Sequence, residues 1–366
     1  MRLSGRKVRR GLTLTALCLV VCVLSGCAMV GPSSISMGRA DYNEAINRTE
    51  DEQLLLSIVK GRYGETYSLL AVTGVAANVR FKANAGVQAG IGSAQSYSGN
   101  LVPFSAGLVY EENPTITYAP IQGEKYLRQL LSPIPLDMVL MAVRSMHWGG
   151  EMLVPLVDRI NDLQNPDFLD SPASEPNPRF MRFIELFKAL HKAGVLELVG
   201  DPRKEIVFDI VIRGYAPQYS QKVREFLALL DLPVPAHEKE DLVIPAYFTL
   251  KADKSWGIAI STRSTWDLIE IMRASVEVPQ EHVREGLIVH YPPMGLPGRG
   301  IRIISSTERP KKISLAVKYR GYWFYIDDTD QSTKSFFNLV CAFWSISMAS
   351  SVDKSGAPVL TLPVGR

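Results

Sequence analysis

Cysteine is scarce in this chain of 366 residues, and three of the four cysteines lie near its start. Cys18, Cys22 and Cys27 occur there, and Cys341 is the fourth. If cleavage of an N-terminal leader removes Cys18 and Cys22, and if Cys27 is modified, the mature chain cannot form an internal disulfide. The apolar neighbours of Cys341 predict a buried, inert thiol. Burial of apolar surface, not covalent cross-links, therefore has to stabilise the fold.

Motifs for catalysis and for metal or nucleotide binding are also missing. No two of the five histidines have His-x-x-x-His spacing, and there is no Gly-x-Ser-x-Gly elbow. Gly86, Gly90 and Gly92 lie along a predicted strand and not at a strand-to-helix turn, which argues against a nucleotide-binding loop. The sequence therefore predicts a protein without enzyme activity, cofactor or metal site.

The body of the chain has no basic block. Residues 1–26 hold five Arg and Lys residues and no acid, which leaves 35 basic and 37 acidic residues and a net charge of −2 in the remainder. This balance argues against nucleic acid as a partner. Charge alone would not hold the protein on an anionic membrane either.

The N-terminal segment carries the clearest motif. Basic residues up to Arg10 precede an uncharged run from Gly11 to Val23, which is too short to span a bilayer but fits a secretory signal. The stretch Leu24-Ser25-Gly26-Cys27 follows and resembles a bacterial lipobox. The resemblance implies that residues 1–26 are cleaved and that Cys27 is lipidated. An ordinary signal peptide or a short membrane anchor is the alternative.

The residues that follow the lipobox bear on location. Ala28 stands where an aspartate would retain a lipoprotein in the inner membrane of enteric-type bacteria, so the resemblance implies the outer membrane. Residues 27–38 are small, with Pro32 and several serines, and predict a flexible tether. The lipid bilayer, reached through acylated Cys27, is therefore an expected partner.

An alternation with a period of two dominates residues 67–118. Every second residue from Leu69 to Ile91 is apolar or small, and the alternation resumes from Val102 to Tyr110 after a turn-rich segment. A helix cannot hold this period. The sequence predicts a long β-hairpin with one apolar and one polar face.

Two explanations of that apolar face remain open. It could pack on the protein's own helices, as one face of an antiparallel sheet commonly does. It could instead face lipid, since a membrane-spanning strand needs only about 9–11 residues. One hairpin would leave unpaired backbone groups in hydrocarbon, so several subunits would each have to contribute a hairpin to one closed assembly.

Helical and strand patterns alternate along the remaining chain and predict an α+β fold with antiparallel sheets and packed helices. We expect helices near residues 39–62, 124–133, 136–147, 151–163, 180–194, 220–230, 265–275 and 333–348. We expect strands near residues 114–120, 195–199, 206–212, 243–250, 256–261, 301–305, 313–319 and 322–327. The proline-rich segment 231–235 suggests a boundary between a helical region, 39–232, and an α+β region, 233–366.

Local signals refine several helices. Thr49 with Glu52, and Ser264 with Asp267, have the spacing of capping boxes. The aspartates at 327, 328 and 330 lack the glycine and later glutamate of a calcium loop, so we interpret them as the cap of the last helix.

The last helix and the hairpin before it each allow two interpretations. The uncharged run 335–352 approaches the length of a membrane span, but its serines favour a helix buried against sheet. Aromatic residues alternate along the hairpin, so half of them should enter the core and the others could stack on a sugar or a partner. These aromatic residues are Tyr319, Tyr322, Trp323, Phe324 and Tyr325.

Several stretches resemble segments of a group of uncharacterised proteobacterial lipoproteins. They are Glu52–Leu56, Arg62–Glu65, Pro114–Tyr118 with Gly123–Lys125, Arg320–Asp328 and Pro358–Gly365. The similarity extends over most of the mature chain. It agrees with lipidation and implies no mechanism, because that group has no assigned activity.

These observations predict an outer-membrane lipoprotein whose periplasm-facing body is an interaction or assembly module. Its expected partners are other envelope proteins or further copies of itself. The first alternative is an oligomeric membrane pore or export component built from the 67–118 hairpin. The second is an envelope enzyme acting on glycan or peptide, which would need a cleft with paired carboxylates or a His-containing nucleophile site.

Overall fold

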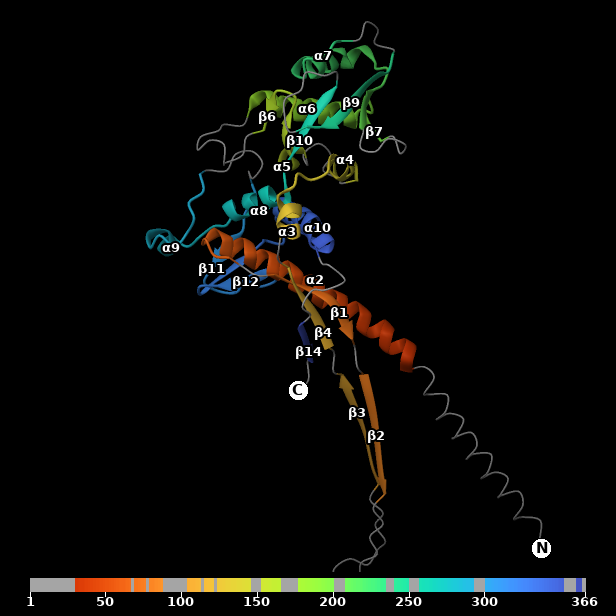
Figure 1. Cartoon of the computed structure of the whole chain (residues 1–366), viewed down its shortest axis with the longest axis vertical. Helices are drawn as coiled ribbons and strands as arrows, with labels where there is room; N and C mark the ends of the chain where they lie inside the picture. The colour runs from red at the N-terminus through yellow and green to blue at the C-terminus, as the bar shows by residue number, and fades with distance from the viewer. Residues whose placement is uncertain are drawn as a thin grey trace, which may run out of the picture. The chain divides into compact units, whose positions relative to one another are not determined.

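The computed structural model shows a mixed α+β fold with antiparallel and mixed sheets (Figure 1). It describes residues 30–66, 69–76, 79–87, 104–112, 115–121, 124–145, 153–165, 177–200, 208–234, 240–249, 257–292, 300–351 and 360–363. The chain divides into two compact units. The first unit takes residues 1–50, 70–120 and 358–366, and the second takes residues 51–69 and 121–357.

The first unit combines the start of helix α2 (Val30–Arg62) with two small sheets. One sheet has the strand order β1-β4-β14, and the other pairs β2 with β3 in antiparallel orientation. The strands are β1 (Leu69–Ala76), β2 (Val79–Val87), β3 (Phe104–Glu112), β4 (Thr115–Ile121) and β14 (Leu360–Pro363). The described residues of the range 67–118 thus form strands, as their period predicts.

The register of β2 and β3 is regular. Pairing runs from Val79 with Glu112 to Val87 with Phe104 without a shift. Residues 88–103, where the predicted turn falls, lie outside the described residues. A single long hairpin with one apolar face remains a prediction.

Helix α2 begins earlier than the sequence suggests. Residues 30–38 belong to it, so the expectation of a flexible tether is wrong over that range. Pro32 is tolerated there because the first N–H groups of a helix have no partner within the helix. Thr49 lies inside the helix, and its hydroxyl donates to the carbonyls of Ala45 and Ile46, both at 2.9 Å. The predicted capping box at Thr49 is therefore wrong.

The second unit contains a six-stranded sheet with the order β6-β5-β10-β9-β8-β7. Only the pair β9–β10 is parallel. The strands are β5 (Val157–Ile160), β6 (Leu163–Gln164), β7 (Leu196–Gly200), β8 (Phe208–Ile212), β9 (Leu242–Phe248) and β10 (Ile258–Thr262). Because β8 and β9 pair across residues 231–235, the domain boundary expected there is wrong.

The helix expected at 151–163 is also wrong beyond its first turn. Helix α5 covers only Leu153–Leu156, and β5 and β6 follow. Ile160 is buried and pairs with Ile260 of β10. Asn161 turns the chain with a φ of 48°, and its side-chain oxygen Oδ1 accepts from Ala259 N at 2.7 Å. Pairing with a distant strand has overridden the local helical pattern.

Helices α6 (Pro178–Lys192) and α7 (Ser220–Leu229) lie with this sheet (Figure 1). The rings of Phe183 and Phe226 stack at 5.3 Å between the two helices. Arg182 binds Glu225 with two hydrogen bonds of 2.6 and 2.8 Å across the same interface. Both helices confirm expectations from the sequence, which places them near residues 180–194 and 220–230.

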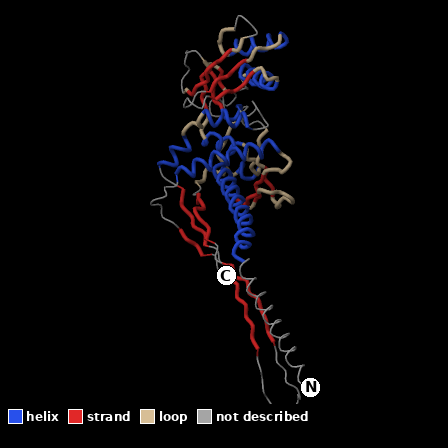
Figure 2. The backbone as a smooth tube through the Cα atoms, turned by 90° about the vertical axis from the view of Figure 1, so that its right-hand side faces the viewer, coloured by secondary structure: helices blue, strands red, loops and turns tan. Residues whose placement is uncertain are grey.

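The rest of the second unit is mainly helical (Figure 2). It holds α3 (Glu124–Leu131), α4 (Leu136–Ser145), η2 (Pro217–Tyr219), α8 (Thr265–Ala274), α9 (Gln280–Arg284) and α10 (Gln331–Ser351). A small antiparallel sheet has the order β11-β13-β12, with β11 (Ile304–Ser306), β12 (Ala316–Tyr319) and β13 (Tyr322–Tyr325). The sequence suggested that the last helix is buried against a sheet. Helix α10 packs instead on the helices α3 and α8.

Local turn and cap signals are largely confirmed in this part. Ser264 and Asp267 form the predicted capping box of α8. Arg320 and Gly321 both have positive φ, 44° and 85°, and turn β12 into β13. Asp330 caps α10, since its carboxylate accepts from the backbone N–H and the hydroxyl of Thr333. Within the described part of the chain, no helix combines the length and apolar character needed to cross a bilayer.

Candidate functional site

The residues singled out in the N-terminal motif have no described placement. Leu24, Ser25, Gly26, Cys27 and Ala28 all lie outside the described residues. Lipidation and sorting therefore remain predictions. Other parts of the chain form a candidate site.

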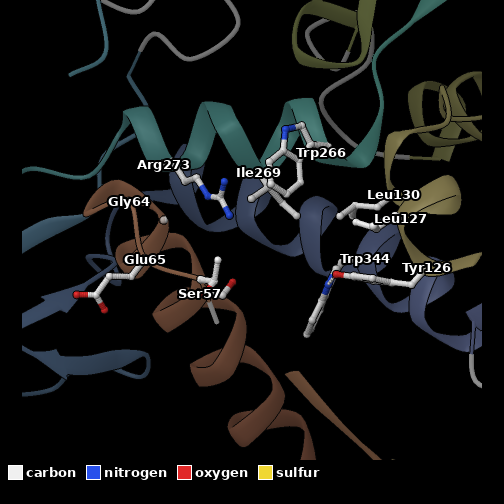
Figure 3. Close-up of a pocket in the computed structure, with 12 residues that line it drawn as sticks. Ser57, Gly64, Glu65, Tyr126, Leu127, Leu130, Trp266, Ile269, Arg273 and Trp344 are labelled. Atoms are coloured by element: carbon white, nitrogen blue, oxygen red, sulfur yellow. Dashed lines mark hydrogen bonds between the residues drawn. The ribbon is translucent and has the colours of Figure 1, made fainter. Parts of the chain in front are cut away.

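A pocket of about 420 Å³ lies among four helices of the second unit (Figure 3). It is bounded by the end of α2 with the turn that follows, and by α3, α8 and α10. The lining residues are Ser57, Gly61, Gly64, Glu65, Thr66, Tyr126, Leu127, Leu130, Trp266, Ile269, Arg273 and Trp344. Aromatic and aliphatic walls with a few polar groups are typical of a ligand site.

Arg273 is the central polar residue of this pocket. Its guanidinium stacks over the ring of Trp266, 4.6 Å from the ring centroid, and its Nη1 donates to Glu270. The side chain lies against Gly61, where a Cβ atom would be 2.1 Å from the Arg273 Nε. Gly61 therefore makes room for Arg273.

A half-buried polar network extends from Arg273 through Glu270 to Tyr291 and Arg62. The other carboxylate oxygen of Glu270 accepts from the hydroxyl of Tyr291 at 2.7 Å. The guanidinium of Arg62 lies over the Tyr291 ring at 4.8 Å. Burial lowers the pKa of Arg62 and raises the pKa of Tyr291, because both charged forms lose solvation.

Several guanidinium nitrogens in this region have no acceptor among the described residues. They are Nε and Nη1 of Arg62 and Nε of Arg273, all of them buried. A buried donor without a partner costs free energy, more so on a charged group. The network therefore has donors in excess of acceptors.

The opposite wall of the pocket is aromatic. Trp344 Nε1 donates to the Tyr126 hydroxyl at 3.3 Å. Burial raises the pKa of Tyr126, which keeps its hydroxyl protonated. Glu65 lines the pocket too, but its carboxylate accepts from Arg320 at 2.9 Å and points away from Arg273 (Figure 3).

An aromatic cluster lies beside the end of α2. The Tyr63 hydroxyl is 2.7 Å from Nδ1 of His282, and both residues are buried. Two residues of the predicted aromatic hairpin join this cluster. Tyr319 contacts Tyr63 edge to face, and Tyr322 contacts His282 edge to face. Phe324 is fully buried, as the alternation predicts for half of the set. Stacking of the others on a sugar or a partner remains a prediction.

The histidines of the described ranges lie in separate environments. His282 binds Tyr63, His191 stacks on Phe187, and His290 is exposed. His147 and His237 lie outside those ranges. No group of three His, Cys, Asp or Glu side chains there could hold a metal ion.

Hydrogen bonds also involve Asp327, Asp328 and Cys341. Asp327 accepts from Thr329, and Asp328 accepts from Ser314. Cys341 is half-buried and not fully buried as predicted, and its Sγ lies 3.5 Å from an oxygen of Asp51. Burial raises the pKa of Asp51.

Comparisons of the chain with protein-family models, with curated proteins and with solved structures give no match. The assignment of the site therefore rests on its geometry.

Sequence reasoning did not find this pocket. Its main residues come from four helices that are far apart in the chain. One signal was available, since Gly61 interrupts an otherwise strong helical stretch and such a glycine often marks a close approach. The partner in that approach, Arg273, could not be identified without the tertiary structure.

Proposed function

We propose that this protein is an outer-membrane lipoprotein that serves as an interaction or assembly module of the cell envelope, facing the periplasm. The observation that carries the proposal is the lipobox-like stretch Leu24–Cys27 after a basic, apolar segment. Several acyl chains on one cysteine would anchor it stably. Anchoring raises its effective concentration for partners at the same membrane.

Labelling and mass analysis test the anchor. We expect the wild type to incorporate labelled palmitate and to begin at a modified Cys27. Cys27→Ser should lose the label and accumulate with residues 1–26 attached. Cys341→Ser is the matched control, because it removes the other cysteine of the mature chain and should keep the label. An unmodified, uncleaved N-terminus in the native protein would refute the anchor.

The module role has its own test. Crosslinking in intact envelopes should join the wild type to defined partners or to further copies of itself. A monomer that crosslinks to nothing in envelopes, although it is lipidated, would refute the module and leave the anchor standing.

An oligomeric pore or export component is the second candidate, and the strands of the first unit favour it. β2 and β3 have nine residues each, the length of a membrane-spanning strand. Their register pairs Ala83 with Leu108 and Ala85 with Ala106, so the two apolar sets coincide. Asn84, from the alternate set, pairs with Gly107.

Paired substitutions distinguish the pore from the module. If the apolar set faces lipid, Ala85→Asp should abolish oligomers in detergent and leakage from lipid vesicles. Asn84→Asp is the matched control, because it adds the same charge one position away on the alternate set. Equal behaviour of both variants, or a wild-type protein that is monomeric and causes no leakage, would exclude the pore.

A further inference from the structure

Arg273 has one nitrogen left to bind a ligand. Its Nη1 donates to Glu270, its Nε is buried against Gly61, and its Nη2 makes no hydrogen bond among the described residues. Nη2 can donate a charge-assisted hydrogen bond to a carboxylate.

The guanidinium is held in place before any ligand arrives. Trp266 covers its face at 4.6 Å, Glu270 binds its Nη1, and the backbone at Gly61 lies against its Nε. Figure 3 shows Arg273 projecting from α8 toward Ser57 on α2. A preorganised donor loses little conformational freedom when it binds.

The charges around this wall favour an anion. Arg62 and Arg273 contribute two positive charges, and Glu270 contributes one negative charge to the same network. Glu65, the acidic residue of the lining, is bound by Arg320. The network thus lacks one negative charge, which an anion in the pocket would supply.

The remaining walls suit an apolar body. Ile269 and Leu130 are buried, Trp266 is half-buried, and Trp344 and Tyr126 close the other side (Figure 3). Tyr126 accepts the Trp344 N–H, so its own hydroxyl proton is available as a second donor. The volume of about 420 Å³ is that of a small-molecule site.

We propose that this pocket binds a carboxylate with an apolar body, and that Nη2 of Arg273 donates to the carboxylate. A fatty acid and the C-terminal residue of a peptide with an apolar side chain share this chemistry. The inference does not depend on lipidation of Cys27 or on the role of β2 and β3, so it can fail or hold independently of the proposed function.

Matched acids and amides test the proposal on the purified full chain in detergent micelles. The probes are hexanoate against hexanamide, and N-acetyl-leucine against N-acetyl-leucine amide. Binding is measured by tryptophan fluorescence and by ligand-observed NMR. We expect at least one acid to bind roughly tenfold more tightly than its amide, because only the acid pairs with the guanidinium. Preference for hexanoate indicates a fatty acid, and preference for N-acetyl-leucine indicates a peptide C-terminus.

Two variants locate the binding. Arg273→Gln should bind acid and amide equally. Leu127→Glu places a negative charge on an exposed residue of the lining and should weaken acid binding roughly tenfold, with little risk to folding. Leu131→Glu is its matched control, because it adds the same charge to an exposed position of α3 outside the lining, and it should bind as the wild type does.

Three results would overturn the proposal. One is that neither acid binds in the millimolar range. Another is that acids and amides bind equally to the wild type. The third is that Leu127→Glu and Leu131→Glu bind the acids alike, which would place the binding elsewhere even if Arg273→Gln does not fold.

Discussion

The position of Arg273 depends on the absence of a side chain at residue 61. A Cβ atom there would lie 2.1 Å from Nε and 2.6 Å from Cζ of Arg273. We predict that Gly61→Ala displaces the arginine and lowers the free energy of unfolding by about 1–3 kcal/mol, the usual cost of overpacking. Urea unfolding followed by circular dichroism measures the change.

A double variant supplies the control for this prediction. If the cost comes from the clash, Gly61→Ala should be much less destabilising in an Arg273→Ala background, where the clashing atoms are gone. Equal destabilisation in both backgrounds would show that Gly61 matters for another reason.

The raised pKa of Tyr63 should make the stability of the fold depend on pH in the alkaline range. Burial, followed by the nearby Tyr319, raises the pKa of Tyr63 to about 12, whereas an unfolded tyrosine has a pKa of about 10. The folded protein therefore holds the proton more tightly. This contribution to stability is complete below about pH 10 and is lost as the pH rises toward about 12.

The variant Tyr63→Phe should reduce this dependence. We expect the free energy of unfolding of the wild type to fall more steeply than that of Tyr63→Phe between about pH 10 and about pH 12. Unfolding curves at a series of pH values measure the two slopes. Parallel slopes would show that Tyr63 does not carry this effect.

Among the elements, helix α8 begins at a position that is fixed by hydrogen bonds between residues close in sequence. Ser264 Oγ accepts from Asp267 N, and the Asp267 carboxylate accepts from Ser264 N. We predict that Ser264→Ala lowers the free energy of unfolding by about 1 kcal/mol, because orphan N–H groups lose their acceptors. Denaturant unfolding tests it.

Ser132→Ala is the control for this loss. Ser132 donates to the carbonyl of Arg128 at the exposed end of α3 and caps no helix start. Its replacement should change stability by a few tenths of a kcal/mol at most. A similar loss in both variants would contradict a special role of the cap.

The structure or packing of other segments depends on distant segments that contact them. The 151–163 segment has apolar residues at helical spacing, yet Val157–Ile160 becomes β5 because β10 offers it a partner. Helix α10 packs on α3 and α8, and its residues Phe336, Val340 and Trp344 are buried. Neither pairing leaves a sign in the local sequence, because the partners are far away in the chain.

At the scale of the whole molecule, the proposed location depends on residue 28. If Ala28 directs sorting, Ala28→Asp should move the protein to the inner-membrane fraction of an enteric-type host. Ala28→Ser, which is small and uncharged, should stay in the outer membrane. Density fractionation followed by immunoblotting measures the distribution. An unchanged location of Ala28→Asp would contradict sorting by this position.

The sequence alone determined the features that depend on neighbouring residues. The period of two from Leu69 onward excluded a helix, the spacing of Ser264 and Asp267 placed the start of α8, and Arg320-Gly321 placed the turn between β12 and β13. Backbone geometry and local hydrogen bonds act over a few residues, so these signals are readable in the chain.

The tertiary structure alone decided which distant segments meet. It joined β9 to β8 in one sheet, and it brought Gly61, Arg273 and Trp344 to the walls of one pocket. Such contacts depend on apolar burial, which is non-directional and does not specify its partners in the local sequence.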